Sequence, residues 1–558
     1  MGTRRLTNRI PRFMVKVSKA HVISRNFLMF LVVAGVMVLL TACSPSAPAS
    51  QSKTQPAPAS PAAGKLTPVL GGTLKVAWPQ KPGPTFGLPM SARGAGATIL
   101  GLCAEALVRP TAQVGVYEPV LAESWEFAKD NSYCTFKIRK GIKFSDGTDL
   151  NAAAVKWNHD RVLASAVPRI RNVTSIDQID DYTLRYNLKS LDAFFLYDFT
   201  WGDTMTIVSP TAYKTKGEDW ALANPVGTGP WILSEFNQNQ SVIFKKNPDY
   251  WMKGIPYLDE IQLLTYMDPL VTMASIQRGE VDVWRELDVA SGKTLNDMGK
   301  FTTEVVTAGD FVLWFNNTDP ASPWSKQPMR EALEYGINKE VNAKALGSGF
   351  SQGTYECLFG INEIGKPGTT PRKYDPEKAK QLVKDAGYPN GVKVKLETNT
   401  KFAASTFVQA LQSDLAKVGI NIELSVQADA AWAELSRLPA TGSTLRYDRQ
   451  QGGGITSFQS AVDQWGTGST TFAGEKRPDG IQALIDKAKN SQDPAVQQAS
   501  LEEMERLLYK ELTIIPLWTN PDIIAYSSNV KWDPSVRKSL WAIAGRGSFF
   551  VQYAWLQK

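Results

Sequence analysis

Residues 392–426 contain a strand pattern, a helix pattern and a second strand pattern, and this order restricts the fold more than any other feature of the chain. Apolar residues alternate with polar ones in both outer stretches, which is the period of a half-buried strand. Between them, apolar residues recur every three or four positions and predict an amphipathic helix that Gly419 ends. The residues that carry these patterns are Val392, Val394, Leu396, Phe407, Leu411, Leu415, Val418, Ile420, Ile422, Leu424 and Val426. This order predicts two parallel strands joined by a right-handed crossover, and hence an α/β fold.

A helix with signals at both of its ends is predicted just before this unit. Asp375 suits the N-cap, Pro376 suits the first helical position, and Gly387 follows the last residue of an apolar stripe. Alternating or β-rich stretches predict further strands at 71–77, 132–139, 182–188, 231–236 and 241–245. The chain therefore mixes strands and helices along its length.

The chain is long, and its excess of positive charge lies in its first residues. With 558 residues it exceeds what one hydrophobic core usually serves, so two or more domains are expected. The formal charge is +7, but residues 1–26 hold seven basic side chains and no acidic one, which leaves 54 of the 61 basic residues against 54 acidic ones. Basic tracts with interleaved aromatic residues are absent, and we expect no nucleic-acid partner.

The N-terminus has the pattern of an export signal. Fourteen apolar residues at 27–40 follow the basic stretch, which is too short for a membrane span of roughly 20 residues and fits the apolar core of a signal peptide. Leu40-Thr41-Ala42-Cys43 resembles the lipobox of bacterial lipoproteins. The resemblance implies cleavage before Cys43 and a lipid on its sulfur; an ordinary cleaved signal or a short anchor are the alternatives.

Residues 44–70 are rich in Pro, Ser and Ala and contain no aromatic residue, which predicts a disordered tether between anchor and body. Three cysteines follow it, Cys103, Cys134 and Cys357. An exported protein could form one disulfide from them, and Cys103 with Cys134 is then the expected pair. Three buried thiols are the preferred expectation.

Residues 123–161 predict a strand, a turn and a helix. Cys134, Phe136 and Ile138 alternate with polar residues, Asp146-Gly147 supplies a turn, and Asn151 suits the N-cap of a helix. The sequence of this stretch resembles family 5 of the extracytoplasmic solute-binding proteins. The resemblance lies in Glu-Ser-Trp, Ile-Arg-Lys-Gly-Ile-Lys-Phe and Ser-Asp-Gly-Thr. These are the oligopeptide-, dipeptide- and nickel-binding receptors of ABC importers.

Further motifs carry the same resemblance over residues 71–558. The most specific is Asn-Pro-Val-Gly-Thr-Gly-Pro at 224–230, which in this family forms a tight turn into a hairpin. Its glycines do not make a phosphate-binding loop, because the GxxxxGK[ST] pattern is absent and Pro230 lacks a backbone N–H. By the same resemblance we expect strands at 277–283, 312–315 and 512–518 and a helix at 329–340.

The resemblance implies a two-lobed periplasmic-binding-protein-like fold (type II, cluster C) with a ligand cleft between the lobes. It also implies an order of segments along the chain. These are a signal peptide and lipobox at 1–43, a tether at 44–70, lobe I at 71–309, lobe II at 310–525 and a return to lobe I at 526–558.

Catalytic patterns are sparse. Of the two histidines, His21 lies in the signal peptide and His159 on the helix that reads as structural. No GxSxG motif accompanies them, and no Cys/His spacing suits zinc. A pair of carboxylates for glycoside hydrolysis is still possible, because the chain has 54 acidic residues and no pattern marks one pair. We expect a binding protein without enzymatic activity, cofactor or metal.

Aromatic residues at strand ends and in loops are the candidates for ligand contact. Two-lobed receptors close around a ligand, and a buried pocket needs aromatic walls with a few polar groups. The residues expected at the lobe interface are Trp78, Trp314, Asn316, Trp432, Phe458 and Trp465.

One departure from the family bears on the ligand. Peptide-binding members carry a Trp-x-x-Asp-Tyr-type segment after a Tyr-Asp, and its aspartate holds the α-amino group of the peptide. Here Tyr447-Asp448 is followed by a different segment, in which Ile455 and Ser457 or Phe458 take those places and Asp463 is out of register. This argues against ordinary di- and oligopeptides and leaves sugars, opines, metal chelates and other small organic solutes.

Three functions are compatible with these observations. The preferred one is a monomeric, lipid-anchored extracytoplasmic receptor that delivers a peptide or other small organic solute to an ABC permease. An exported hydrolase on a similar scaffold is the second, and the histidine count argues against it. An interaction, chaperone or signalling lipoprotein that uses the same closure is the third.

Overall fold

The computed structural model describes residues 67–92, 94–111, 116–165, 170, 172–200, 204–358, 370–403, 405–450, 457–533 and 551–557. The predictions for residues 1–66, including the lipidation of Cys43, and for Ile455 lie outside the described residues. Residues 67–558 form one compact unit and are described by themselves.

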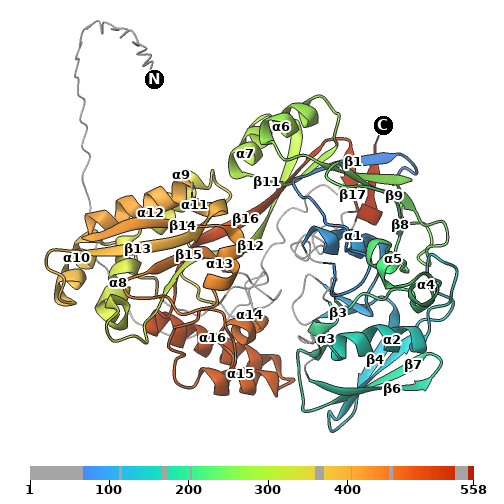
Figure 1. The fold of residues 1–558 in the computed structure, drawn as a ribbon, viewed down its shortest axis with the longest axis horizontal. Coiled ribbons are helices and arrows are strands. Elements are labelled where there is room, and N and C mark those ends of the chain that lie inside the picture. The colour runs from blue at the N-terminus through green and yellow to red at the C-terminus, as the bar shows by residue number, and fades with distance from the viewer. Residues whose placement is uncertain are drawn as a thin grey trace, which may run out of the picture. The chain divides into compact units, whose positions relative to one another are not determined.

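A mixed ten-stranded sheet runs through this unit (Figure 1). Its strands are, in sheet order, β14 (Ile420–Gln427), β13 (Val392–Asn399), β15 (Leu445–Gln450), β12 (Phe301–Phe315), β16 (Ile515–Ser527), β11 (Val283–Leu287), β1 (Thr73–Trp78), β10 (Glu260–Thr265), β9 (Ser241–Lys246) and β8 (Trp231–Asn237).

The predicted crossover unit is confirmed at one edge of this sheet. β13 and β14 are parallel, with Val392 opposite Ile420, and α12 (Thr406–Lys417) connects them. Gly419 ends the helix with φ +87°, a backbone conformation that residues with a Cβ rarely adopt. The helix before the unit is also confirmed, because α10 (Pro376–Asp385) starts at Asp375, whose side chain accepts a hydrogen bond from the Lys378 N–H.

The two longest strands, β12 and β16, pair with each other along most of their length, and their pairing has a break between Thr307 and Asp310 of β12. Before the break, residues 301–307 of β12 pair with residues 521–527 of β16, which β11 flanks on the other side. After it, residues 310–313 pair with 515–519, and β15 flanks β12 there. Gly309 stands in the break with φ +147°, and a Cβ there would lie 2.6 Å from the Gln450 carbonyl oxygen. We call this break the strand crossing.

Separate hydrophobic cores lie on the two sides of the strand crossing. One cluster takes all its buried residues from 311–518, and the clusters on the other side draw theirs from 74–295 and 523–554. We call the side with the buried residues of 74–295 and 523–554 the first lobe. The side with those of 311–518 is the second lobe. The predicted boundaries at 309/310 and 525/526 stay predictions.

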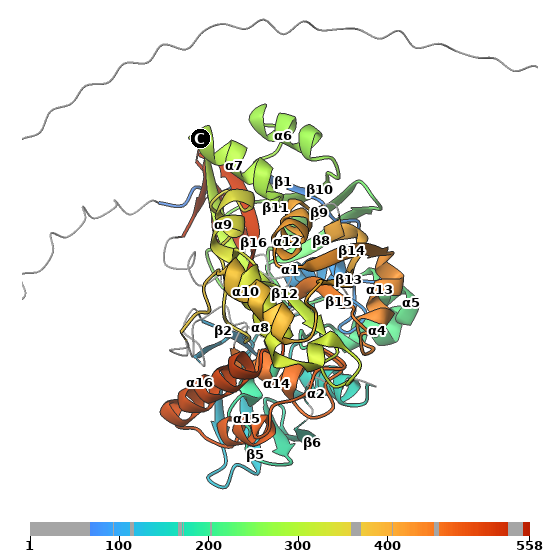
Figure 2. The ribbon, with the colours of Figure 1, turned by 90° about the vertical axis from the view of Figure 1, so that its left-hand side faces the viewer.

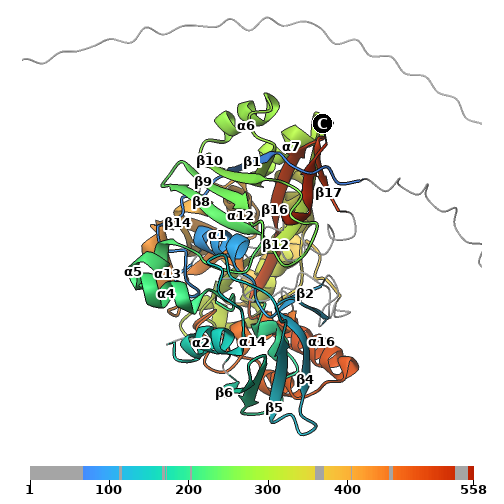
Figure 3. The same cartoon turned by 90° about the vertical axis from the view of Figure 1, so that its right-hand side faces the viewer.

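A second sheet of four antiparallel strands belongs to the first lobe, and α2 (Ala152–Leu163) packs against it (Figure 3). The predicted strand, turn and helix around it are confirmed. β5 covers Tyr133–Ile138, the Thr148 N–H donates to the Asp146 carboxylate, and Asn151 accepts from the Ala154 N–H at the start of α2. The strands in order are β4 (Ala122–Phe127), β5, β7 (Thr183–Leu188) and β6 (Val173–Asp180).

The remaining elements surround these sheets. Two short strand pairs are β2 (Val108–Pro110) with β3 (Tyr117–Pro119) and β17 (Val530–Trp532) with β18 (Ala554–Leu556). Other helices of the first lobe are α1 (Ala95–Cys103), α3 (Phe195–Asp198), α4 (Pro210–Lys216), α5 (Glu218–Ala223), α6 (Pro269–Gln277) and α7 (Val289–Asp297). Those of the second lobe are α8 (Gln327–Gly336), α9 (Lys339–Leu346), α11 (Thr400–Ala403), α13 (Asp429–Leu435), α14 (Ser457–Trp465), α15 (Ile481–Lys489) and α16 (Pro494–Glu511). Turns of 3₁₀-helix cover Pro323–Ser325 and Val551–Tyr553.

Three predicted elements differ from the structure. The helix expected at 329–340 is two helices, because Ile337 is extended and Asn338 caps α9 anew. The strand expected at 277–283 begins only at Val283, since Gln277 ends α6 and Gly279 turns the chain with φ +72°. The strand expected at 512–518 begins at Ile515, because Leu512 closes α16 in a left-handed conformation.

The glycines of the 224–230 motif serve close packing. A Cβ on Gly227 would lie 2.3 Å from the carbonyl oxygen of Cys103, and one on Gly229 would lie 2.6 Å from its carbonyl carbon. The motif therefore lets the chain cross the end of α1 before it enters the hairpin of β8 and β9, whose antiparallel pairing is confirmed. Cys103, Cys134 and Cys357 are all buried free thiols, as expected.

His159 is part of the core of the first lobe. Its Nδ1 lies 2.6 Å from the Tyr186 hydroxyl and its Nε2 lies 3.3 Å from the Met205 carbonyl oxygen. A carbonyl only accepts, so Nε2 carries the proton and Nδ1 accepts from the tyrosine. Burial lowers the pKa of His159 to about 4.

This lowered pKa predicts a loss of stability in acid. Between pH 6.5 and 4 the unfolded chain binds a proton at this histidine that the folded chain does not, so stability falls by about 3 kcal/mol as the pH drops through that window. We expect His159→Gln to flatten the pH dependence of the thermal midpoint there. Tyr186→Phe keeps the histidine and should keep the slope; parallel profiles for wild type and His159→Gln would contradict the assignment.

Candidate functional site

Three of the six aromatic and polar candidates come together in the second lobe. The Trp314 ring contacts the rings of Trp432 and Phe472, with centroids 5.9 and 5.7 Å apart, and Phe472 contacts Trp465 at 5.4 Å. We call these four residues the aromatic cluster. The indole N–H groups of Trp314 and Trp465 are buried and have no hydrogen-bond partner in the described part of the chain.

The other three candidates have different partners. Asn316 closes a local turn, in which its side-chain oxygen accepts from the backbone of Thr318 and Asp319. Phe458 stacks on Phe194 of the first lobe, with ring centroids 3.6 Å apart. Trp78 ends β1 and donates its indole N–H to Glu286, 3.2 Å away.

Charged side chains of both lobes lie within electrostatic range of one another near the strand crossing. Asp522 of β16 interacts electrostatically with four charged residues, two from β11 and two from the second lobe. The set, which we call the charged group, is Arg285, Glu286, Lys401, Asp448, Arg449 and Asp522. It holds three acidic and three basic side chains, so it can receive a ligand that carries both signs of charge.

Asp448 is an acid of the charged group whose carboxylate is held by two hydrogen bonds. Its carboxylate accepts hydrogen bonds from the indole N–H of Trp432 and from the backbone N–H of Arg449. Burial raises the pKa of Asp448, and these hydrogen bonds together with Arg449 and Lys401 oppose the rise. Trp432 thus joins the charged group to the aromatic cluster.

Glu286 faces the same region from the first lobe because of a bulge in β11. The pairing of β11 with β16 shifts between Arg285 and Leu287, and Glu286 has φ +55°. This conformation exposes Glu286 while its neighbours on both sides are buried, and Trp78 and Gln80 both donate to its carboxylate. Strained backbone of this kind is concentrated at functional sites.

Sequence reasoning missed the charged group. Its members come from four distant stretches, and single charged residues in strands give no local pattern. The Tyr447-Asp448 pair was one available signal, but its importance was placed in the residues after it and not in Asp448 itself. The bulge at Glu286 has no sequence signal that we can identify.

A second set of contacts joins the lobes away from the strand crossing. Besides the stack of Phe194 on Phe458, the Lys489 ammonium lies 3.1 Å from the Asp192 carboxylate, and the Lys489 carbonyl accepts from the Ala193 N–H. Gln492 also donates to the Asn131 side chain across 3.1 Å. We call these contacts the lobe latch.

Two negative findings concern the described residues. They contain no group of three His, Cys, Asp or Glu side chains placed to hold a metal ion. Within the same ranges, every helix is too short or too polar to cross a membrane.

Strands that run between two lobes with separate cores define a two-lobed solute-binding fold, and the comparisons agree. The profile of the bacterial extracellular solute-binding proteins, family 5, matches residues 116–473. The chain belongs to this family.

Similar proteins are found by sequence and by structure. The glutathione-binding protein GsiB of Shigella flexneri is 29% identical over 430 residues, which cover 74% of this chain and 82% of that protein. The DppA protein of Helicobacter pylori, solved with the peptide STSA, has a TM-score of 0.72 at 22% identity and covers 88% of this chain and 99% of its own. NikA of Brucella suis, solved with Fe(III)-EDTA, has a TM-score of 0.71 at 22% identity and covers 85% of this chain and 99% of its own.

Proposed function

We propose that this extracytoplasmic solute-binding component of an ABC importer captures a small peptide or peptide-like solute that carries both an ammonium and a carboxylate. The observation that supports this most is the charged group. Its acids, Asp448 above all, suit the ammonium, and Lys401 and Arg449 on the same lobe suit the carboxylate.

The aromatic cluster supplies the apolar part of the proposed site. Trp432 contacts Asp448 with its N–H and Trp314 with its ring, so the apolar surface begins where the charged group ends. The unpartnered N–H groups of Trp314 and Trp465 are buried donors, and a ligand carbonyl could accept from them.

Two of the three relatives named above favour the same class of solute, whereas NikA was solved with a metal chelate. The GsiB proteins are named for glutathione, a tripeptide, and DppA was solved with a four-residue peptide. The segment after Asp448 argues against peptides, because Ile455 and Ser457 or Phe458 take the places of the tryptophan and the aspartate. Ile455 lies outside the described residues, and Phe458 stacks on Phe194. Asp448 offers an acid for the peptide ammonium that does not depend on that segment.

Solute binding is proposed to close the two lobes, and the lobe latch is the part of closure that can be tested directly. Phe458→Ala removes the stack on Phe194, so we expect a wider distribution of distances between spin labels at Lys129→Cys and Lys487→Cys, two exposed positions outside the latch contacts. The native cysteines are buried and should not react.

The control for the latch is Phe407→Ala. Phe407 stacks on Trp518 within the second lobe, with centroids 4.6 Å apart, so its loss should leave the label distance unchanged. A distribution that is the same in Phe458→Ala as in wild type would show that these contacts do not hold the lobes together.

Location and partners are also part of the proposal. The pattern at residues 27–43 supports lipidation of Cys43, residues 44–70 would tether a monomeric body, and the closed form would dock on the permease. No catalytic step is proposed, and His159, fully buried and hydrogen-bonded on both ring nitrogens, is not available for one.

A thermal-shift screen of residues 67–558 tests the class of solute, with native mass spectrometry for any ligand that co-purifies. A ligand at a hundredfold excess over its Kd stabilises the folded state by about 2.7 kcal/mol. Shifts with small peptides support the proposal, and shifts only with sugars or chelates overturn it. No shift with any solute would favour an interaction or signalling lipoprotein.

A further inference from the structure

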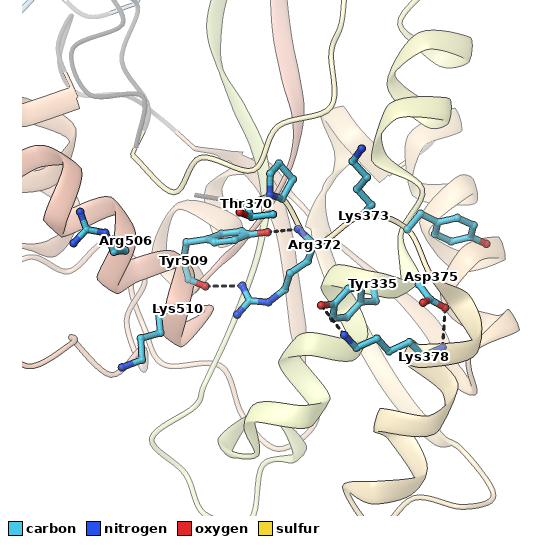
Figure 4. A pocket seen from close by; sticks show the side chains of 11 residues that line it. Tyr335, Thr370, Arg372, Lys373, Asp375, Lys378, Arg506, Tyr509 and Lys510 are labelled. Atoms are coloured by element: carbon cyan, nitrogen blue, oxygen red, sulfur yellow. Dashed lines mark hydrogen bonds between the residues drawn. The ribbon is translucent and has the colours of Figure 1, made fainter. Parts of the chain in front are cut away.

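A pocket on the second lobe shares no residue with the solute site and is strongly basic. It has a volume of about 730 Å³ and is formed by the end of α8, the chain that leads into α10, and the last turns of α16 (Figure 4). Figure 2 shows where these three helices lie in the fold. The lining side chains include five cations, Arg372, Lys373, Lys378, Arg506 and Lys510, and one carboxylate, Asp375. We call it the basic pocket.

The acidic groups near the basic pocket are already engaged. Asp375 accepts from the Lys378 N–H at the start of α10, across 2.9 Å. Outside the lining, Glu503 pairs with Arg506, and Glu331 lies 3.9 Å from Arg372. Within the lining, five cations therefore face one carboxylate, and each of these two outside acids approaches one of the lining arginines.

Arg372 is held in a fixed position in the wall of the pocket. Its Nη1 donates to the Tyr509 carbonyl oxygen across 2.9 Å, and its guanidinium lies over the Tyr509 ring, 4.7 Å from the ring centre (Figure 4). Its side chain is only 19% exposed. A fixed, planar guanidinium with remaining N–H donors is suited to phosphate or carboxylate oxygens.

The three lysines around Arg372 are exposed, and none of them forms an ion pair with a described residue. Lys378 donates to the Tyr335 hydroxyl across 2.8 Å, and this hydrogen bond raises its pKa. In the described part of the chain, Lys373 and Lys510 have no carboxylate within ion-pair distance. Lys373 and Lys510 beside the fixed Arg372 therefore form an anion-binding site, and its anion comes from another molecule.

The chain before the body points to the source of that anion. If Cys43 carries a lipid, as its sequence pattern predicts, residues 44–70 can reach about 90 Å when extended. The body then stays beside a membrane surface, where the phosphate groups of anionic lipids are concentrated. Basic residues near such a surface contribute to binding within a Debye length.

We propose that the basic pocket binds the phosphate of an anionic phospholipid headgroup and docks the second lobe on the membrane. Arg372 supplies paired N–H donors to the phosphate, and Lys373 and Lys510 supply charge at its rim. This site is independent of the solute, so its failure would leave the proposed function untouched.

Vesicle sedimentation with residues 67–558, a compact unit that lacks the anchor, tests the proposal. We expect binding to phosphatidylcholine vesicles that contain phosphatidylglycerol and none to phosphatidylcholine alone. Lys373→Ala with Lys510→Ala should weaken that binding about thirty-fold, since each basic residue at an anionic surface contributes roughly a fivefold factor. The matched control, Lys214→Ala with Lys216→Ala on α4, removes the same charge elsewhere and should retain binding.

Three results would overturn the proposal. Equal losses in the two double variants would mean that general charge, not the pocket, attracts the membrane. Binding of inorganic phosphate that is lost in Lys373→Ala with Lys510→Ala, without any vesicle binding, would assign the pocket to a free phosphate compound. No binding of either probe would leave an acidic protein partner as the occupant.

Discussion

Asp448→Asn is expected to lower the affinity for a small peptide with free termini about thirty-fold or more. Removing one member of a buried, hydrogen-bonded charge pair typically costs about 2–5 kcal/mol of binding energy. Asparagine loses the charge that would face the ammonium, and it can accept only one of the two hydrogen bonds that Trp432 and Arg449 donate. Isothermal titration calorimetry measures the loss.

The variant should lose about 1–3 kcal/mol of folding stability, because one of these two N–H groups loses its acceptor. A loss of this size leaves the protein folded at the temperature of the titration. Asp385→Asn, at the exposed end of α10, is the matched control and should bind as wild type does. An affinity for Asp448→Asn within threefold of wild type would remove Asp448 from the site.

Lys339→Met is expected to lower the free energy of unfolding by about 3–5 kcal/mol, because it leaves a carboxylate buried without its cation. Lys339 and Glu334 are both fully buried, and the ammonium lies 2.7 and 2.8 Å from the two carboxylate oxygens. Tyr509 also donates to Glu334, across 3.2 Å, and would be its remaining partner. Urea unfolding followed by tryptophan fluorescence gives the loss.

The double variant Glu334→Leu with Lys339→Met distinguishes the cost of an unpaired buried charge from the cost of changed packing around Lys339. With both charges gone, no ion is left buried, and we expect most of the lost stability to return. If the double variant is as unstable as Lys339→Met, the loss comes from packing around the lysine and not from the uncompensated carboxylate.

The same ion pair explains an element that the sequence did not reveal. The family resemblance predicted one helix at residues 329–340, but Glu334 lies in α8 and Lys339 opens α9. Their contact holds the two helices across the extended Ile337. The break at Ile337 depends on a contact between side chains of both helices, and no local sequence pattern predicts such a contact.

Elements with local signals were predicted well for physical reasons. Asn151 and Asp375 cap their helices as expected, because capping depends on residues within three positions. Gly419 ends its helix because its positive φ is a property of one residue. Parallel pairing of β13 with β14 followed from the order of strand, helix and strand alone.

The candidate site was predictable only in its aromatic part. Trp314, Trp432 and Trp465 are large residues near the ends of strands and helices, and they meet in the structure. Whether they touch a ligand stays a prediction. The charged group depends on the strand crossing, which brings Glu286 toward residues more than a hundred positions away, and no local pattern encodes that approach.

The most direct test of the proposed solute class is calorimetric titration of residues 67–558 with one tripeptide in two forms. The form with free ammonium and carboxylate ends should bind with a Kd near micromolar, about −8 kcal/mol. The same tripeptide with an acetylated N-terminus and an amidated C-terminus should bind at least thirty-fold more weakly, because neither end then carries the charge that the charged group receives. Equal binding of the two forms, or no binding of either, would contradict the proposed solute class.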